Sequence, residues 1–277
     1  MSATDSHKEY YEIPEFWNYN FLDDETERMR VSAVILSIPE DVQSILEVGC
    51  GNGAIVNNIA KQRKMEKIVG VDISTSALAH VKTEKVEGNI NDLKFKNKSF
   101  DLIIASEVIE HLTHNDFLRG IEEIQRISDQ YILISVPNNE QLQVNTRMCH
   151  NCYCWFNPDY HMKVFDKQKL SSLFDKFEVV WVKAIGPVLK SIQYSKIAAI
   201  WFHYLKRNIP RIGICPQCGF NHSEYQKKES GSVHYKKQDN FFKKKMNVMF
   251  EIFLKLFFTR KVNKSRWLLV LYKRSRY

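Results

Sequence analysis

Leu46-Glu47-Val48-Gly49-Cys50-Gly51-Asn52-Gly53 is the stretch that decides the fold of this chain. Residues 44–46 form a short apolar run typical of a strand, and residues 54–60 repeat apolar side chains at helical spacing. Glycines permit backbone angles and a close approach that a Cβ would block. The first turn of a helix adds backbone N–H groups that need acceptors. The stretch therefore predicts a strand, a glycine turn and a helix that together hold the polar part of a nucleotide-like cofactor.

A second predicted strand, residues 67–72, ends in the carboxylate of Asp72. An acidic residue about 20 positions beyond the glycine turn is where a ribose diol would be bound. Gly49, Gly51 and Ala54 also fit the G-x-G-x-x-G/A pattern of dinucleotide-binding dehydrogenases, so the glycines alone leave two cofactor classes open.

Two further features separate these classes. Glu47-x-Gly49-x-Gly51-x-Gly53 resembles the first motif of class I S-adenosylmethionine-dependent methyltransferases, and residues 99–112 resemble the fourth-strand motif of that family, including its Glu-His-Leu ending. The resemblance covers residues 40–185 and the last strand. It implies an α/β fold with a Rossmann-like seven-stranded sheet whose last strand is antiparallel.

The resemblance also implies which residues contact S-adenosylmethionine. Asp72 would bind the ribose hydroxyls, and residue 89 with the backbone of Ile90 would hold the adenine. The family often has aspartate where this chain has Asn89, which can still donate an amide hydrogen bond. The expected cofactor residues are Glu47, Gly49, Cys50, Gly51, Gly53, Asp72, Ile73, Asn89, Ile90 and Ser106. Arg28 and Arg30 could face a cofactor carboxylate, but a solvated helix face is the preferred expectation.

Periodicity predicts the remaining elements and the domain boundaries. Expected helices cover residues 24–37, 115–127 and 166–174, and later strands cover 100–105, 131–136, 177–184 and 266–272. About 80 residues separate the last two strands, too many for a turn. We therefore expect a cap segment at 1–43, a methyltransferase domain at 44–186 plus 265–277, and an insertion at 187–264.

The charge of the chain is divided along its length. Residues 1–185 hold 20 Lys and Arg against 28 Asp and Glu, whereas residues 186–277 hold 20 Lys and Arg against 4 Asp and Glu. No signal peptide and no uncharged apolar run of about 18 residues is visible, which predicts a cytoplasmic protein. In that compartment the six cysteines are expected as thiols or metal ligands.

Two C-x-x-C pairs predict a structural zinc site. Cys149 and Cys152 form one pair, and Cys215 and Cys218 form the other. Four thiolates make a closed tetrahedral site, which would join the insertion to the loop after the fifth strand. Cys154, His150 and His222 are substitute ligands, and unligated thiols are the alternative.

The insertion is expected to be mainly helical. Residues 192–205 and 246–258 are apolar helix candidates flanked by basic clusters such as Lys243-Lys244-Lys245. Such segments suit the anionic inner surface of a membrane. Equally, the two helices would bury each other or form a homodimer interface.

The predicted reaction is O-methylation of a small molecule, a sugar or a lipid-linked glycan. Methyl transfer needs alignment, and a general base only where the acceptor keeps its proton until transfer. The candidate bases are His161, which is favoured by its place after strand five, and His111. RNA methylation by the basic insertion and a non-catalytic cofactor-binding scaffold are the alternatives.

Overall fold

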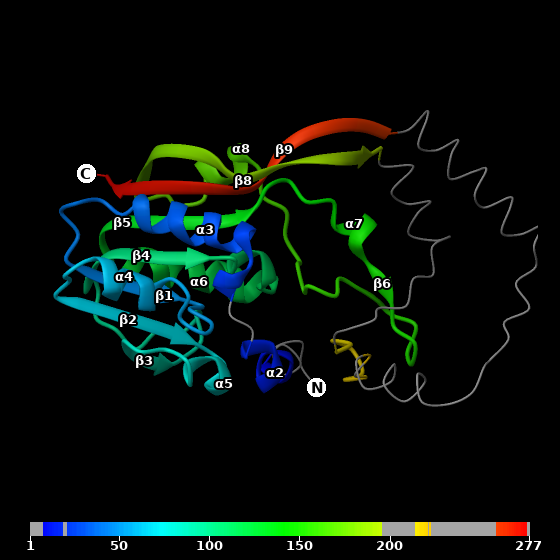
Figure 1. Ribbon diagram of the computed structural model, residues 1–277, viewed down its shortest axis with the longest axis horizontal. Helices are drawn as coiled ribbons and strands as arrows, with labels where there is room; N and C mark the ends of the chain where they lie inside the picture. Colours follow the sequence, from blue (N-terminus) through cyan, green and yellow to red (C-terminus); the bar gives the residue numbers. More distant parts are fainter. Residues whose placement is uncertain (1–7, 19–20, 196–213, 221, 223–258, 276–277) are drawn as a thin grey trace, which may run out of the picture. The chain divides into compact units, whose positions relative to one another are not determined.

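The computed structural model of the chain describes residues 8–18, 21–195, 214–220, 222 and 259–275 (Figure 1). Their contacts divide the chain into two compact units. We call them the sheet unit, formed by His7–Glu140, His161–Val188 and Ser265–Tyr277, and the cysteine unit, formed by Met1–Ser6, Gln141–Tyr160 and Leu189–Lys264.

The described elements begin with three helices, after which strands and helices alternate from the first strand to the third. The helices are α2 (Pro14–Trp17), η1 (Phe21–Asp23), α3 (Glu25–Leu36), α4 (Val56–Gln62), α5 (Thr75–Leu78), η2 (Ile109–His111), α6 (His114–Ile127), α7 (Leu142–Asn145) and α8 (Lys167–Ser171). The strands are β1 (Ser44–Val48), β2 (Lys67–Asp72), β3 (Glu84–Glu87), β4 (Phe100–Ser106), β5 (Ser128–Pro137), β6 (Arg147–Met148), β7 (Trp155–Phe156), β8 (Phe177–Tyr194) and β9 (Thr259–Arg274).

The principal sheet has seven strands in the order β3-β2-β1-β4-β5-β9-β8. The first five strands of this order pair in parallel. β9 runs antiparallel to β5, from Tyr131 opposite Lys273 to Pro137 opposite Trp267. The predicted Rossmann-like sheet with an antiparallel last strand is therefore confirmed.

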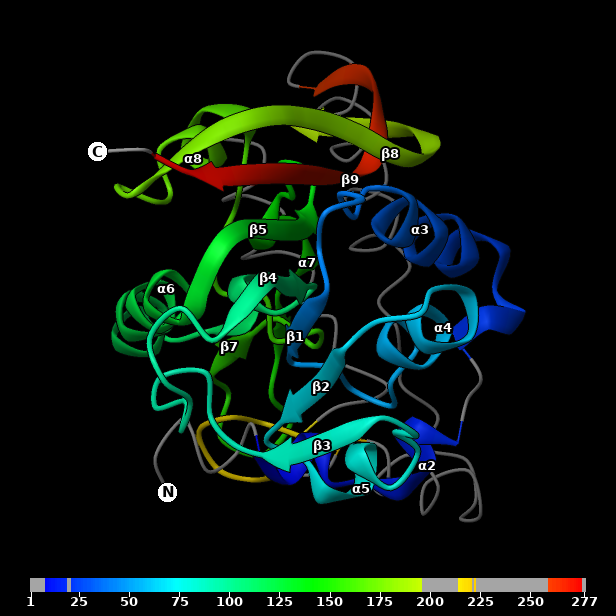
Figure 2. The same cartoon turned by 90° about the vertical axis from the view of Figure 1, so that its left-hand side faces the viewer.

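Helices cover both faces of the sheet, with α3 and α4 on one side and α6 on the other (Figure 2). On the first face, Val34 of α3 and Ile59 of α4 pack with Ile104 of β4. On the second face, Ile124 of α6 packs with Ile103 of the same strand. All five side chains are completely buried, and Ile103 and Ile104 point to opposite faces, as expected for parallel strands covered on both faces.

Side-chain caps fix where several helices begin. Asp24 accepts hydrogen bonds from the backbone N–H groups of Thr26 and Glu27 and so starts α3. Ser74 caps α5, and Thr113 caps α6. The predicted helices at 24–37 and 115–127 are confirmed, whereas the helix predicted at 166–174 is shorter and ends at Ser171.

The last two strands are longer than the sequence pattern predicted. β8 continues to Tyr194, ten residues past the predicted Ala184, and β9 begins at Thr259 rather than at Arg266. The helix predicted at 192–205 is consequently wrong at its start, because residues 192–194 belong to β8. The rest of that candidate and residues 246–258 lie outside the described residues.

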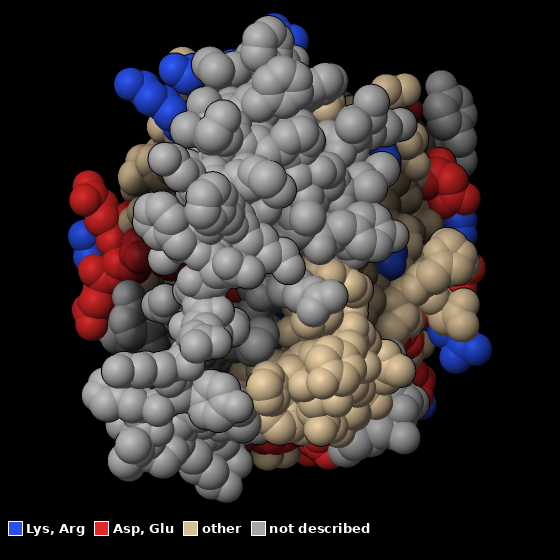
Figure 3. Space-filling view, turned by 90° about the vertical axis from the view of Figure 1, so that its right-hand side faces the viewer, with Lys and Arg blue, Asp and Glu red and all other residues tan. Residues whose placement is uncertain are grey.

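In the helices that the structure describes, none combines the length and the apolar character that a membrane crossing requires. On the face drawn in Figure 3, both acidic and basic side chains of described residues reach the margins of the view. The described part of this face therefore carries charges of both signs.

Candidate active site

The register of the sheet brings the carboxyl ends of three strands to one edge. Val48 of β1 lies opposite Val71 of β2 and Ala105 of β4. The residues that directly follow these positions are Gly49, Asp72 and Ser106. This edge is where open α/β sheets bind ligands, and all three residues belong to the predicted cofactor site.

The glycine turn needs its glycines. Gly49, Gly51 and Gly53 have φ angles of +69°, +52° and +79°, a region that side chains disfavour. A Cβ on Gly49 would lie 2.4 Å from Val108 Cγ2, and a Cβ on Gly51 would lie 2.9 Å from Trp17 Cζ3. The N–H groups of Gly49 and Cys50 both donate to the Val71 carbonyl, at 2.7 and 3.0 Å. The turn is therefore anchored to β2.

Asp72 lies directly against this turn. Its Oδ2 accepts a hydrogen bond of 2.8 Å from the Gly51 N–H, and its Oδ1 accepts one of 3.0 Å from the Ser74 N–H. The side chain is 8% exposed, and burial raises the pKa of its carboxyl despite these hydrogen bonds. Asp72 thus orders the loops on both sides of the strand edge, and each oxygen keeps a second lone pair for a ligand hydroxyl.

Glu47 is the other acidic residue of the predicted site. It is 2% exposed, and its Oε2 accepts a 3.1 Å hydrogen bond from the Val56 N–H at the start of α4. Burial raises the pKa of Glu47 to about 8, although that hydrogen bond and the charge of Arg30 act in the opposite direction. Glu47 therefore joins the strand before the glycine turn to the helix after it.

The N-terminal segment covers the glycine turn and the loop after β2. Glu12 accepts hydrogen bonds from the N–H groups of Thr75 and Ser76, at 2.9 and 3.0 Å. These bonds outweigh desolvation and hold the pKa of Glu12 down, at about 2. Trp17 lies against Gly51 and donates through Nε1 to the Tyr11 carbonyl at 2.5 Å. The described part of the N-terminal segment, which was expected to be a cap, thus contacts both the glycine turn and the loop after β2.

Ser106, at the end of β4, is held from α3. Arg30 donates through Nη1 to Ser106 Oγ and through Nε to Glu27 Oε2, and it is 8% exposed. The prediction that Arg30 lies on a solvated helix face is wrong, because this helix turns that face towards the strand edge. Arg28 instead donates to the carbonyls of Leu22 and Asp23 at the surface.

The predicted adenine residues form a turn after β3. Asn89 Oδ1 accepts a 3.2 Å hydrogen bond from the Asn91 N–H, so this turn uses the amide oxygen and not the amide nitrogen. Ile90 is buried, and a Cβ on Gly120 of α6 would lie 3.1 Å from it. The side chain of residue 90 therefore anchors the turn, while residue 89 presents its amide group.

The two candidate bases lie together. The rings of His111 and His161 are 4.7 Å apart in an edge-to-face arrangement. His161 is hydrogen-bonded through Nδ1 to the Glu140 carboxylate, and His111 shares a 3.3 Å hydrogen bond between its Nδ1 and the Tyr11 hydroxyl. The N–H groups of Met162 and Lys163 donate to the Glu110 carbonyl at 2.7 and 3.1 Å, which fixes this pairing in the backbone.

Contacts connect the histidine pair to the glycine turn. Tyr11 bonds to His111, the ring of Trp17 lies 6.2 Å from the ring of Tyr11, and Trp17 lies against Gly51. The histidine pair is therefore linked to the glycine turn through two aromatic side chains of the N-terminal segment.

Three residues of this site were not predicted from the sequence. Glu107 has a left-handed φ of +58° and accepts hydrogen bonds from Ser135 Oγ and Trp267 Nε1. Glu110 is completely buried, and neither of its carboxylate oxygens has a hydrogen-bond partner among the described residues. Glu140 orients His161. The Glu-His ending of the fourth-strand motif is the sequence feature that could have identified Glu110 as a site residue.

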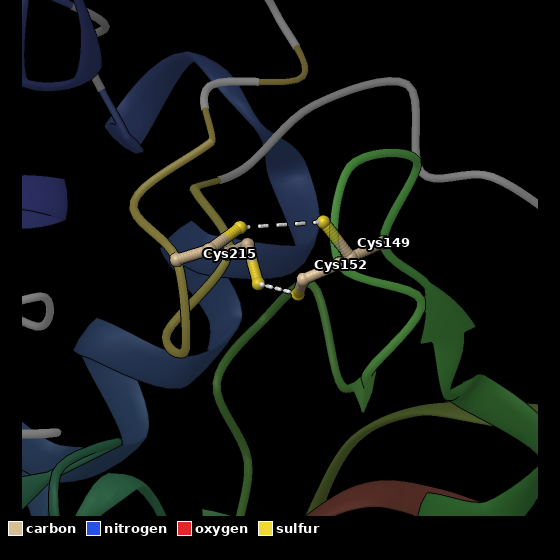
Figure 4. Close-up of side chains that lie close together, drawn as sticks. Cys149, Cys152 and Cys215 are labelled. Atoms are coloured by element: carbon tan, nitrogen blue, oxygen red, sulfur yellow. Dashed lines mark hydrogen bonds between the residues drawn. The ribbon is translucent and has the colours of Figure 1, made fainter.

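In the cysteine unit the two predicted pairs come together. The Sγ atoms of Cys149 and Cys218 are 3.8 Å apart, and those of Cys152 and Cys215 are 3.6 Å apart (Figure 4). All four sulfur atoms lie within 4.8 Å of one another. Tetrahedral zinc with Zn–S bonds of about 2.3 Å places its sulfurs about 3.8 Å apart, so the four residues fit that metal.

The backbone of the two pairs is equivalent. The N–H of Tyr153 donates to the Cys149 carbonyl, and the N–H of Gly219 donates to the Cys215 carbonyl. Both donors have left-handed φ angles, +61° and +68°. Each turn thus directs its two thiols to one side. Of the substitute ligands, Cys154 Sγ lies 3.2 Å from Cys215 Sγ, and His222 is buried against Phe220 and Phe156.

Comparison with known proteins agrees with this geometry. A family described as "Methyltransferase domain" matches residues 16–182. An uncharacterized protein of Methanocaldococcus jannaschii is 28% identical over 57% of this chain and 67% of its own length. A probable S-adenosylmethionine-dependent methyltransferase of Mycobacterium tuberculosis strain H37Rv is 30% identical, over 35% of this chain and 36% of its own length. The chain thus spans about a third of that mycobacterial relative.

A solved complex of the Haloferax volcanii Trm112 methyltransferase activator with a methyltransferase shows the same fold. The similarity covers 100% of this chain and 99% of the solved chain, with a TM-score of 0.54 and 13% identity. The matched domain, the seven-stranded sheet and the glycine turn lead to one conclusion. The chain belongs to the class I S-adenosylmethionine-dependent methyltransferases.

Proposed function

We propose that this methyltransferase acts on a hydroxyl group of a small molecule, a sugar or a lipid-linked glycan. The observation that supports O-methylation is the His111–His161 pair, which is linked to the glycine turn through Tyr11 and Trp17 and is engaged by Glu140 on one ring and Tyr11 on the other. A hydroxyl is a poor nucleophile while it keeps its proton, so this acceptor class needs such a group.

We further propose that the glycine turn, Asp72 and Ile90 hold the cofactor as the family resemblance implies. S-adenosylmethionine supplies a methyl group on a sulfonium, and transfer breaks the carbon–sulfur bond as the acceptor oxygen forms its bond to carbon. The acceptor proton is removed at the histidine pair. Arg30 and Ser106 keep the end of β4 in place, and Trp17 and Tyr11 restrict water around the turn.

Substitution of His161 tests this function. Transfer from radiolabelled S-adenosylmethionine to a panel of phenols, sugars and extracted polyprenyl-linked glycans identifies the acceptor class. We expect His161→Asn to lower the transfer rate by about 10²–10⁴-fold while calorimetry shows unchanged cofactor affinity. His114→Asn is the matched control, since His114 is exposed on α6. Label that enters RNA would refute a small-molecule, sugar or glycan acceptor and favour RNA methylation, and no product with any acceptor would favour a cofactor-binding scaffold.

The basic insertion at 187–264 is proposed to recognise the acceptor at an anionic membrane surface on the cytoplasmic side. Its supporting feature is sequence alone: Lys243-Lys244-Lys245 directly precedes the apolar residues 246–258, all outside the described residues. Replacing these three lysines by glutamate should abolish sedimentation with phosphatidylglycerol vesicles, whereas Lys227→Glu with Lys228→Glu should have a smaller effect. Binding to RNA with a steep salt dependence, and not to vesicles, would contradict this proposal.

We also propose one structural zinc held by Cys149, Cys152, Cys215 and Cys218. The agreement between the sulfur–sulfur distances and the edge of a ZnS₄ tetrahedron supports it. A homodimer is a further expectation from the insertion. The Haloferax neighbour was solved with the Trm112 activator, but at 13% identity that partnership is not carried over to this chain.

A further inference from the structure

We propose that Glu110, His111 and His161 bind a divalent cation of the first transition row, and that this cation holds the acceptor hydroxyl for methylation. The inference deepens the proposed O-methylation and rests on it for the role of the cation, although the binding site itself does not depend on the acceptor.

The three residues present a metal-ligand set. One carboxylate oxygen of Glu110 and one ring nitrogen from each histidine lie within 4.8 Å of one another. His111 Nε2 lies 4.0 Å from Glu110 Oε1. Two imidazoles with one carboxylate form a recurrent ligand set for such cations, and they leave coordination positions open for water or substrate oxygen.

Glu110 gives independent support for a ligand at this place. Its side chain is completely buried, and neither oxygen accepts a hydrogen bond from a described residue. A buried carboxylate without a partner is costly, and native proteins rarely leave one without an ion, a water or a catalytic role. A bound cation would give the Glu110 carboxylate the partner that the described residues do not provide.

Both histidines are oriented in the way metal-bound histidines are. Nδ1 of His161 is engaged by the Glu140 carboxylate, and Nδ1 of His111 is engaged by the Tyr11 hydroxyl. Such outer partners fix the tautomer and the ring direction of a metal ligand. The backbone bonds from Met162 and Lys163 to the Glu110 carbonyl hold the two ligand segments, 50 residues apart, in one arrangement.

The position suits acceptor binding. The cluster is joined through Tyr11 and Trp17 to the glycine turn, so a hydroxyl on the cation would lie near the cofactor end of the sheet. A bound cation lowers the pKa of an attached hydroxyl, and the released proton passes to water. The histidine pair then still brings about the loss of the acceptor proton, as the proposed function requires, but it acts through the cation that it binds and not as a free base.

Direct metal binding tests the proposal without an acceptor. The full chain, with its cysteine site intact, is freed of other metals by brief chelation and titrated with Mn²⁺ under electron paramagnetic resonance. Mn²⁺ is chosen because thiolate sites do not favour it. We expect one Mn²⁺ per chain outside the cysteine site. Glu110→Gln and His161→Asn should each weaken Mn²⁺ binding more than 100-fold, and Glu140→Gln by about 10–100-fold.

Two exposed residues of α6 provide controls. Glu122→Gln and His114→Asn make the same substitutions at positions outside the cluster. Both variants should bind Mn²⁺ like the unmodified protein. Mn²⁺ should raise the melting temperature of the unmodified protein but not that of Glu110→Gln, whose melting curve without metal shows that the variant is folded. Absence of Mn²⁺ binding, or equal binding by Glu110→Gln and His161→Asn, would overturn the cation site. If those results came with intact cofactor binding and hydroxyl methylation, the proposed function would stand without it.

Discussion

Asp72 accepts a hydrogen bond from the Gly51 N–H at 2.8 Å, and this contact joins the end of β2 to the middle of the glycine turn. The same carboxylate accepts the Ser74 N–H, so one side chain orders both loops at the cofactor edge. A residue that was expected only to bind ribose hydroxyls therefore also shapes the site.

The first prediction follows from this double role. Asp72→Ala should weaken S-adenosylmethionine binding in calorimetry by about 1.5–3 kcal/mol, the usual range for a hydrogen bond to a charged group. Asp101→Ala is the matched control, because Asp101 also accepts two backbone N–H bonds, from Gln43 and Ser44, but at the opposite end of β1. The control should lose stability and keep cofactor affinity. Equal affinity in both variants, or tighter binding of a nicotinamide dinucleotide, would contradict the assignment.

The second prediction concerns pH and Glu47. Its pKa is about 8 in the folded chain, raised by burial from an ordinary 4.5. The folded state therefore binds more protons than the unfolded state between these values, and Glu47 lowers the free energy of unfolding as the pH rises from about 4.5 to 8. Glu47→Gln should remove this loss, of the order of several kcal/mol, because each pKa unit corresponds to about 1.4 kcal/mol.

Urea unfolding without cofactor at pH 5, 6.5 and 8 measures the effect. The glutamine can still accept from the Val56 N–H through its amide oxygen, so the comparison isolates the charge. Glu122→Gln, on the exposed side of α6, should follow the unmodified protein. Parallel pH profiles for Glu47→Gln and the unmodified protein would show that the carboxyl is not protonated in the fold.

The third prediction assigns the zinc ligands. Protein purified without added zinc should contain one zinc per chain by mass spectrometry of the metal. Cys152→Ser or Cys218→Ser should lose it, whereas Cys154→Ser should keep it, although its sulfur lies 3.2 Å from Cys215. Zinc loss in Cys154→Ser would replace one of the four assigned ligands, and a metal-free, stably folded preparation would exclude the site.

The parts of the fold that depend on local signals could be predicted. The glycine turn, the strand before it and the helix that begins after Asp24 are each specified by a few neighbouring residues. Each of the two cysteine turns is likewise specified by its own few residues. Their meeting across 62 intervening residues was predicted only because four thiols prefer one metal.

The remaining features depend on tertiary contacts. β8 continues past Ala184 although Val188 is 66% exposed, so no burial pattern marks its extension. Arg30 has the sequence context of a surface residue, and only the sheet edge beside α3 explains its burial. Glu110 belongs to a motif that was noticed, yet nothing in the sequence shows that its carboxylate is completely enclosed.

The last prediction concerns Trp267 and Glu107. Trp267 is 2% exposed and donates through Nε1 to Glu107 Oε2 at 2.8 Å, from β9 to the end of β4. Trp267→Phe keeps an aromatic ring but leaves a buried carboxylate oxygen without its donor, which should cost about 1–3 kcal/mol of unfolding free energy. Trp181→Phe is the control, because Trp181 is a half-buried side chain of β8, and it should lower the free energy of unfolding by less. In a double-mutant cycle, Glu107→Gln combined with Trp267→Phe should be more stable than the sum of the single changes predicts, because the unpaired charge is gone. Additive effects would mean that the tryptophan stabilises β9 only through its ring, and that Glu107 is held in its left-handed conformation by Ser135 and Arg30 instead.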